Sequence, residues 1–567
     1  MTFVILQSCC NDASCVDVCP VDCIHPTQDE PEFMRTEMLH IDPGACIDCG
    51  ACVDECPVDA IKADHELDVD EGRYVDLNAD YFEQHPTRTT DYTSQIPAWK
   101  GVDFSGRRVA VVGSGPAAFY AATELAAIRG IEIEMYERAL TPYGLVRAGV
   151  APDHPQTKAV TDLFRSVAGK KSVRVHLGVD IGTDLTHQDL MDHHDAVVYA
   201  TGADGDRVLG IPGEDLPGSH AAAEFVAWYN GNPEFTDRTF DLSSHRAVVI
   251  GNGNVALDVA RILTMPVEEL AHTDIADHAL QCLRHSNIEE VVVLGRRGSA
   301  QAKFTNPELI ALSNSCDVDI VVRPEEAEPD PETLAAMTHR TTESDVATKV
   351  NLLRELSGRH RRETGSNAKK KQIVFRFCAT PISLLGDESV TGIRFAHSEL
   401  KRSDDGTIRA EQTEREETLD TGFVVRSVGY RGRPVSGVPF DSQRGVIPNL
   451  NGRVTDNSGT TVPGVYVTGW IKRGPTGVIG TNRHCATETV RNLLADLATG
   501  VVHPSPHGRD ALDELLAQRA PSTLDFRDWT AIDKAEVSAG SESGRPRIKF
   551  VEREAMRAAL SRNGDRY

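Results

Sequence analysis

The chain has 567 residues, of which 40% are hydrophobic and 25% charged, and its formal net charge is −26. This length predicts several domains, and the ordinary composition excludes a collagen, a coiled coil and wholesale disorder. No apolar run is long enough to cross a membrane, and the first residues lack the basic flank of a signal peptide, so we expect a cytoplasmic protein.

The negative charge is concentrated near the N-terminus. Residues 1–105 hold 22 Asp and Glu against 5 Lys and Arg, a net charge of −17 that leaves −9 for all other residues. Such a field argues against nucleic acid and membrane surfaces as partners. It attracts basic protein faces, although it could also serve solubility alone.

The cysteines are clustered as well, because nine of the 13 lie within the first 56 residues. The spacing Cys46-x2-Cys49-x2-Cys52-x3-Cys56-Pro57 is that of bacterial ferredoxins, whose first three thiolates hold one iron–sulfur cluster while the fourth reaches the other cluster. Zinc sites usually pair two short CxxC units, and disulfide frameworks belong to small secreted domains, so both readings are disfavoured.

A near-repeat predicts a second cluster. CVDVCPVDCI, at residues 15–24, recurs as CVDECPVDAI at residues 52–61, which indicates two copies of one cluster-binding half. The crossed ligation rule gives two ligand sets: Cys19, Cys46, Cys49 and Cys52 for a [4Fe-4S] cluster, and Cys9, Cys15 and Cys56 for the other cluster. Cys10 and Cys23 fall outside both spacings and are expected to be small buried residues.

The first copy departs from the pattern at Asp12, which stands where the second thiolate is needed. We favour an empty corner, and hence a [3Fe-4S] cluster, over an Asp12 carboxylate that ligates the fourth iron of a [4Fe-4S] cluster. These residues resemble the seven-iron type of bacterial ferredoxin. Residues 1–78 are therefore predicted to form an α+β two-cluster ferredoxin domain, and residues 79–105 a linker.

The next segment is typical of a dinucleotide-binding fold. RRVAVVGSGPAAFYAATELAAIRG predicts a strand, a glycine turn and a helix, and IEIEMYE predicts a second strand that ends at Glu137. The turn lets a pyrophosphate approach the helix N-terminus through Gly113, Gly115, Ala117 and Ala118. Because Glu137 can accept both ribose hydroxyls and repels a 2′-phosphate, FAD or NAD fits this fold better than NADP.

The segment ERALTPYGLVRAGVAPDHPQTKAV, at residues 137–160, resembles the stretch that follows the FAD acid in the adrenodoxin-reductase family. The resemblance implies that Leu145 packs on the flavin nucleotide. It also implies that Asp153 and His154 lie near the isoalloxazine ring as catalytic residues, although a histidine in a turn often has no such role. HLGVDIGTDL resembles the strand whose backbone near Ile181 touches the adenine.

A second strand, glycine turn and helix appear in AVVIGNGNVALDVARIL, at residues 247–263. The returning strand ends in Arg296 and Arg297, whose guanidinium groups can clamp a 2′-phosphate, so this fold is predicted to select NADP. The following QAKFTNPEL again resembles the reductase family and implies that Glu308 contacts the NADP side of the site. The turn residues expected to bind the cofactor are Asn252, Gly253, Asn254 and Val255.

Residues 354–376 hold eight Lys and Arg against two Glu. Their charge is opposite to that of the N-terminal module, so they could dock that module or a separate ferredoxin. A flexible, solvated loop explains them equally well.

The segment GVYVTGWIKRGPTGVIGTN, at residues 464–482, predicts the return of the chain to the FAD fold. Here the resemblance to the adrenodoxin-reductase family is strongest. It implies that Trp470 and the backbone of Gly477, Val478 and Ile479 contact the flavin. A glycine-rich turn before a helix suits this task, because it can aim amide donors at the charge of a reduced ring.

Together these segments predict a ferredoxin domain followed by an α/β two-dinucleotide-binding flavoprotein fold. Its expected parts are residues 106–212 (FAD, first part), 213–424 (NADP) and 425–567 (FAD, second part). The predicted activity is that of an FAD-dependent ferredoxin–NADP(+) reductase, which exchanges electrons between NADPH, FAD and its own clusters, or with a separate ferredoxin or another one-electron acceptor. The alternatives are an electron-supply subunit like that of glutamate synthase and a non-catalytic redox sensor.

Overall fold

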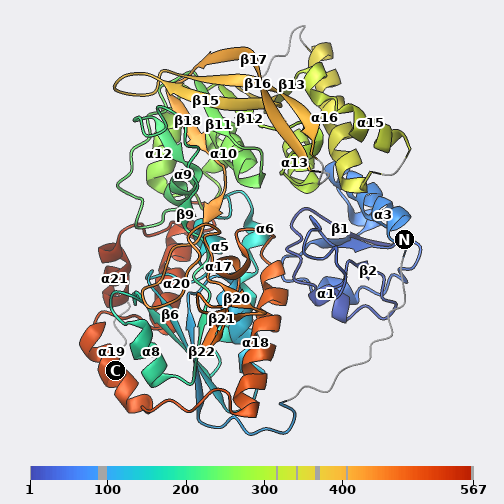
Figure 1. Cartoon of the computed structure of the whole chain (residues 1–567). Coiled ribbons are helices and arrows are strands. Elements are labelled where there is room, and N and C mark those ends of the chain that lie inside the picture. The colour runs from blue at the N-terminus through green and yellow to red at the C-terminus, as the bar shows by residue number, and fades with distance from the viewer. Residues whose placement is uncertain are drawn as a thin grey trace.

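The computed structural model describes residues 2–86, 99–314, 317–339, 342–363, 371–403 and 407–562. Figure 1 shows three bodies: a small N-terminal module in blue at the right, a mixed α/β body at the lower left that contains β6 and β22, and a second body at the top that contains β11 and β12. The chain passes from the module to the lower body, then to the upper one, and returns to the lower body.

The N-terminal module is built from two equivalent halves. Strand β1 (Phe3–Ile5) pairs antiparallel with β4 (Ile61–Ala63), and β2 (Ile24–His25) pairs with β3 (His40–Ile41). Short helices α1 (Ser14–Asp17) and α2 (Ala51–Asp54) each follow a residue with positive φ, Ala13 at 60° and Gly50 at 76°. Because equivalent positions share this unusual backbone, the structure confirms the repeat.

A longer helix, α3 (Arg73–Gln84), closes the module and crosses the boundary expected at residue 78. Tyr74, Leu77, Asn78 and Tyr81 form its buried face. The Asn78 amide donates to Ile5 O and its carbonyl accepts from Ile5 N and Ile41 N, so one side chain ties this helix to both small sheets. Of the linker expected at residues 79–105, residues 87–98 lie outside the described residues.

The lower body is a seven-stranded sheet in the order β20-β21-β22-β8-β5-β6-β7. Five strands run parallel: β5 (Arg107–Val112), β6 (Ile131–Glu137), β7 (Val173–Leu177), β8 (Ala196–Tyr199) and β22 (Thr461–Val467). Two short strands complete the edge, β20 (Asn449–Leu450) and β21 (Arg453–Thr455). Since β22 pairs with β8, the chain does return to this sheet after the upper body.

Helices cover this sheet on both sides. The alanine-rich α4 (Pro116–Ala126) packs on β5 and β6 and against α18 (Thr481–Thr499). The shorter helices are α5 (Leu145–Ala148), α6 (Pro155–Lys158), α7 (Thr161–Ala168), α8 (His187–His193) and α17 (Trp470–Arg473). The C-terminal stretch adds α19 (Arg509–Arg519), α20 (Phe526–Glu542) and α21 (Arg553–Arg562).

The upper body is a parallel six-stranded sheet in the order β10-β18-β11-β12-β14-β13. Its strands are β10 (Ser219–Ala221), β11 (Arg246–Ile250), β12 (Glu290–Leu294), β13 (Val318–Val322), β14 (Lys371–Arg376) and β18 (Phe423–Arg426). The boundary expected between residues 424 and 425 therefore falls inside β18. A three-stranded antiparallel sheet is attached to it: β15 (Ala379–Leu385), β16 (Gly392–Arg402) and β17 (Ile408–Asp420).

Helix α10 (Asn254–Thr264) follows β11 and is buried along most of its length. The other helices of this body are α9 (Ala222–Tyr229), α11 (Val267–Leu270), α12 (Asp277–Arg284), α13 (Asn306–Asn314), α14 (Pro324–Ala327), α15 (Pro331–Thr338) and α16 (Ser344–Glu363). The two segments that join the bodies pair with each other as β9 (Gly205–Asp206) and β19 (Tyr430–Arg431). Within the described residues, no helix is long and apolar enough to span a membrane.

The N-terminal module docks on both bodies, but not through Arg354, Lys371 or Arg376, the basic side chains of residues 354–376 that the structure describes. Arg354 pairs with Glu328, Arg376 with Glu326 and Glu417, and the Lys371 ammonium donates to Leu263 O, all within the upper body. Instead, Arg73 of the module forms an ion pair with Glu355, an acidic residue of this segment. For these residues the docking prediction is wrong, while residues 364–370 and the side chains of residues 359–363 lie outside the described part.

Candidate functional site

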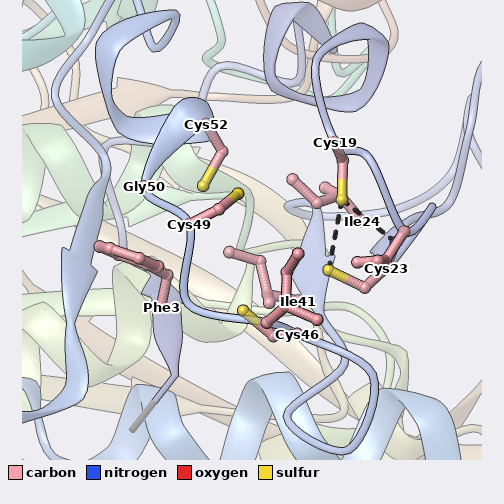
Figure 2. A pocket seen from close by; sticks show the side chains of 11 residues that line it. Phe3, Cys19, Cys23, Ile24, Ile41, Cys46, Cys49, Gly50 and Cys52 are labelled. Atoms are coloured by element: carbon pink, nitrogen blue, oxygen red, sulfur yellow. Dashed lines mark hydrogen bonds between the residues drawn. The ribbon is translucent and has the colours of Figure 1, made fainter.

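One pocket of the N-terminal module is lined by the second cysteine set, which consists of Cys19, Cys46, Cys49 and Cys52. Figure 2 shows their sulfur atoms around a common space, with Phe3, Ile24 and Ile41 beside them. Cys19 comes from the first copy of the repeat and the other three from the second copy. The structure therefore brings together the residues that the crossed pattern predicts.

The first cysteine set, Cys9, Cys15 and Cys56, lines the other pocket together with Asp12. The fourth cysteine of each run behaves alike: Cys56 Sγ accepts from Ala60 N at 3.2 Å, and Cys19 Sγ accepts from Cys23 N at 3.4 Å. Burial raises the pKa of the Cys9 thiol to about 12, so a cation must replace its proton before this sulfur can act as a thiolate. These thiol-lined, largely apolar pockets fit iron–sulfur clusters.

Asp12 is buried and its carboxylate already has partners. Its oxygens accept from Ser14 Oγ at 2.6 Å and from Ser14 N at 3.2 Å, and Arg483 lies 4.0 Å away. Cys10 and Cys23 are buried, as expected, but both also line the pockets, and Cys23 Sγ lies 3.4 Å from Cys19 Sγ.

The first nucleotide turn is tight around Gly113. Its φ is 110°, and a Cβ at this position would lie 2.5 Å from Ala200 O, so only glycine fits between the two strands. A Cβ at Gly115, by contrast, would meet nothing within 4 Å, while Ala117 and Ala118 are buried behind the turn. The backbone is thus open on the side where a pyrophosphate would approach.

Glu137 ends β6 beside this turn. One carboxylate oxygen accepts from Ser114 N at 3.0 Å and Ser114 Oγ at 2.7 Å, and the other accepts from Ala139 N at 2.9 Å. Burial raises the pKa of Glu137, which these hydrogen bonds counteract. The carboxylate is therefore held at the strand end, where the ribose of a bound dinucleotide would lie.

Two further features fit an FAD molecule along this edge. Leu145 at the start of α5 is 43% exposed, although its neighbour Val146 is buried. The hydroxyl of Thr201, in the turn after β8, is buried and has no hydrogen-bond partner among the described residues. An exposed leucine and an unsatisfied hydroxyl indicate a ligand surface. Ile181 lies further along, in a bridge with Leu185.

The second nucleotide turn repeats this geometry at Gly251. Its φ is 124°, and a Cβ there would lie 2.0 Å from Ser427 O, whereas Gly253 has open space. Asn254 Oδ1 accepts from Thr305 N at 2.8 Å, and Asn252 O accepts from Lys303 N and Phe304 N. The turn therefore holds the 301–309 stretch beside it, while Val255 lies in the first turn of α10.

Three cations gather past the end of β12. Arg296 is exposed, Arg297 is half-buried, and for neither is a carboxylate partner found among the described residues. Partial burial lowers the pKa of Arg297, with a further contribution from Arg296, and burial and Arg297 lower the pKa of Lys303. Such mutual repulsion favours a bound anion.

Asp153 and His154 lie in a charged network centred on Arg261 of α10. The guanidinium donates to Asp153 at 2.6 Å, to Asp258 at 2.7 Å, and lies 2.7 Å from His154 Nε2. Burial acts to raise the pKa of Asp153, but Arg261 holds it below its usual value. The lower body supplies Asp153 and the upper body Arg261, so the network joins the two.

Glu308 of α13 stands at the edge of this network. Its carboxylate lies 4.0 Å from His154 Nδ1 and 3.7 Å from Arg261, and burial raises its pKa. The N-terminal module reaches it too, because Gln7 Nε2 lies 3.4 Å from Glu308 Oε2. The structure thus brings Glu308 beside Asp153 and His154, which belong to a different segment of the sequence.

The return segment lies beside the first turn. A Cβ at Gly469 would lie 2.5 Å from Ala117 Cβ, so the start of α17 touches α4. Trp470 Nε1 donates to Thr476 O at 3.1 Å, and Gly477 has a φ of 78°. Thr481 Oγ1 donates to Val478 O and Asn482 Nδ2 to Ile479 O. The backbone amides of residues 477–479 have no backbone partner among the described residues.

Sequence reasoning missed Arg261, Lys303 and Gln7. Arg261 and Lys303 lie in the two segments quoted above for the NADP fold, AVVIGNGNVALDVARIL and QAKFTNPEL. Nothing in a linear pattern, however, places the end of α10 beside Asp153. Gln7 had no signal at all, since its contact with Glu308 depends on how the N-terminal module docks.

Comparison with protein-family models gives two matches. Residues 107–312 match the pyridine nucleotide-disulphide oxidoreductase family, and residues 39–62 match the 4Fe-4S binding domain. The first match covers both nucleotide turns, and the second covers the cysteine run that begins at Cys46.

Relatives match over nearly the whole chain. A probable ferredoxin/ferredoxin–NADP reductase of Mycobacterium tuberculosis is 46% identical over 99% of this chain and 95% of its own length, and one of Mycobacterium leprae is 44% identical over 97% and 96%. The solved structure of Mycobacterium tuberculosis FprA in complex with NADPH is 42% identical, with a TM-score of 0.74 over 80% of this chain and 99% of that chain.

Proposed function

This chain belongs to the ferredoxin/ferredoxin–NADP reductase family, and we propose that it carries electrons from NADPH through FAD to two clusters in its own N-terminal module. One observation carries the proposal: the return segment, which packs against α4 at Gly469 and Ala117, also donates a hydrogen bond to the cysteine loop of the module, from Gly480 N to Cys10 O at 2.6 Å. FAD, when bound, supplies the chemistry that takes up a hydride and releases single electrons.

NADPH is the proposed electron donor. The Arg296, Arg297 and Lys303 cations would hold its 2′-phosphate, and Gly253, Asn254 and Val255 its pyrophosphate, since charged guanidinium groups bind phosphate in paired hydrogen bonds. The similar FprA structure, which contains NADPH, supports this choice. Glu137 would repel a 2′-phosphate, which supports FAD in the other fold.

The Arg261 network would order the reacting ends of the two cofactors. Arg261 holds Asp153 as a carboxylate and His154 in a fixed orientation, while Glu308 faces His154 from the upper body. Because the network crosses between the two bodies, it would fix the distance between the nicotinamide and flavin sites. We propose Asp153 and His154 as the catalytic residues, and Leu145, Trp470 and Ile479 as flavin contacts.

For the clusters we propose the crossed ligand sets, with a [4Fe-4S] cluster on Cys19, Cys46, Cys49 and Cys52. The other cluster would bind Cys9, Cys15 and Cys56 and have three irons. The hydrogen bonds from Ser14 to the Asp12 carboxylate support an empty corner, because a carboxylate so engaged is a poorer ligand.

The test compares NADPH with NADH as reductants of the FAD- and iron-loaded protein, with ferricyanide as acceptor. We expect much faster oxidation of NADPH. Equal rates would contradict the proposed role of the arginines, and binding of NADPH without turnover would favour a redox sensor. Isolation in a stoichiometric complex with a large synthase would instead support an electron-supply subunit.

A further inference from the structure

The two cysteine pockets differ in their relation to the flavin fold. The loop that carries Cys9 and Asp12 touches the reductase backbone directly: Gly480 N donates to Cys10 O at 2.6 Å, and a Cβ at Gly480 would lie 2.1 Å from Asp12 N. No side chain could fit between them. Gly480 directly follows Val478 and Ile479, the proposed flavin contacts.

Side chains secure the same contact. Arg483 of α18 donates to Asp12 O at 2.8 Å and to Ser14 Oγ at 3.0 Å, and lies 3.4 Å from the Asp17 carboxylate. Val58 and Ala60, next to Cys56, belong to the apolar core that also contains α4 of the FAD fold. The loop that carries Cys9 and Asp12 and the residues that follow Cys56 are thus anchored on that fold.

A buried hydroxyl lies on the reductase side of this contact. Tyr120 of α4 is 1% exposed, and its Oη has no hydrogen-bond partner among the described residues. Tyr120 and Cys10 of the cysteine loop belong to the same apolar core, so this side chain packs at the contact. An unsatisfied polar atom here fits a charged group in the pocket beside it.

The second cysteine set, by contrast, has one member that is exposed to solvent. Cys49 is exposed, and the neighbouring Ile47 is 58% exposed, which is unusual for a large apolar residue beside a ligand run. An exposed apolar residue next to a thiol-lined pocket suits contact with another protein.

We propose that electrons enter the N-terminal module at the first cysteine set and leave it from the second. In each transfer the reduced flavin loses one electron, and the cluster held by Cys9, Cys15 and Cys56 gains that electron. That cluster is reoxidised when the Cys19, Cys46, Cys49 and Cys52 cluster takes the electron, which then passes to a one-electron acceptor protein at the Cys49 face. The order rests on the ligand sets proposed above.

Cys49→Ser in the full-length, FAD- and iron-loaded chain separates the two possible orders. After anaerobic mixing with NADPH, rapid-freeze EPR should show the first cluster changing its signal at the wild-type rate, while reduction of cytochrome c, a basic one-electron acceptor, is lost. A first cluster that stays in its starting state would overturn the order. In Cys15→Ser, NADPH should no longer reduce the second cluster to the wild-type extent, although dithionite still does.

Iron content and EPR of the same variants test the ligand sets separately. If Cys15→Ser removes the second cluster, the ligand assignment is wrong and the order falls with it. If each variant loses the cluster assigned to it but the first cluster of Cys49→Ser is not reduced, only the order is wrong.

Arg483→Glu tests the contact without touching a ligand. Reversing this charge should slow reduction of the first cluster severalfold, with ferricyanide reduction unchanged, because ferricyanide can take electrons from flavin. Arg491→Glu, an exposed site on the same helix, is the matched control and should change neither rate. An unaltered cluster rate in Arg483→Glu would contradict entry through this contact.

Discussion

Gln7 of the N-terminal module lies 3.4 Å from Glu308 of the reductase, nitrogen to carboxylate oxygen. Glu308 in turn faces His154 across the two nucleotide folds. The module therefore takes part in the proposed nicotinamide site as well as receiving electrons, a contact that a separate ferredoxin would make only while docked.

Gln7→Leu should weaken NADPH use modestly. At 3.4 Å the hydrogen bond from Gln7 to Glu308 is long and therefore weak, so its loss costs about 0.5–1.5 kcal/mol, and the KM for NADPH should rise by less than roughly tenfold with ferricyanide as acceptor. Gln84→Leu is the control, because Gln84 also joins the module to the reductase, at Thr342 O, away from the site. Equal effects in the two variants would show that Gln7 acts only through docking.

Arg296→Ala and Arg297→Ala should each raise the KM for NADPH. A charge-assisted hydrogen bond to phosphate contributes about 1.5–3 kcal/mol, which corresponds to roughly 10- to 100-fold. The KM for NADH should stay unchanged, since NADH lacks the 2′-phosphate. Arg284→Ala, an exposed arginine of α12, serves as control, and a parallel loss with both nucleotides would argue against a phosphate clamp.

Asp274 is expected to be a major stabilising residue. Its carboxylate lies 2.7 Å from Lys158 of the FAD fold and 3.1 Å from Lys549 of the C-terminal segment. Removing one member of a buried ion pair costs about 3–5 kcal/mol, so Asp274→Asn should clearly lower Tm at pH 7. Asp277→Asn should have little effect, because the Asp277 carboxylate that pairs with Arg545 is 59% exposed.

The same residue should make stability depend on pH. Although burial acts to raise it, the two lysines hold the pKa of Asp274 well below its usual value. A carboxyl with a depressed folded pKa contributes fully above its unfolded pKa of about 4, and this contribution is lost as pH falls further. Chemical denaturation between pH 7 and 3 should show this acid loss in the wild type and a smaller one in Asp274→Asn.

Asp12→Cys should supply the missing thiolate. If the corner is empty, the air-oxidised wild type shows the EPR signal of an oxidised three-iron cluster, and the variant gains a fourth iron and loses that signal. Eight irons per chain in an anaerobic wild-type sample, without a three-iron signal, would refute the empty corner.

The local chemistry was readable from the sequence, because cluster ligands and nucleotide turns depend on short spacings such as Gly113-x-Gly115 and the run from Cys46. The way in which the module docks on the reductase could not be predicted from the sequence. Net charge suggested that an acidic module would bind basic residues, yet Arg354 and Arg376 are neutralised inside the reductase. In the actual contacts each side contributes both basic and acidic residues: Lys349 of the reductase pairs with Glu37 of the module, and Arg73 of the module pairs with Glu355 of the reductase. These pairs arise from tertiary packing.

We propose above all that NADPH reduces the protein's own clusters through its flavin. Anaerobic stopped-flow mixing of the FAD- and iron-loaded protein with NADPH, followed by absorbance and by rapid-freeze EPR, tests it most directly. We predict that the flavin is reduced first and that a cluster signal changes next, with a much slower response to NADH. Reduction of the flavin while both clusters remain in their starting state, although dithionite reduces them, would contradict the account.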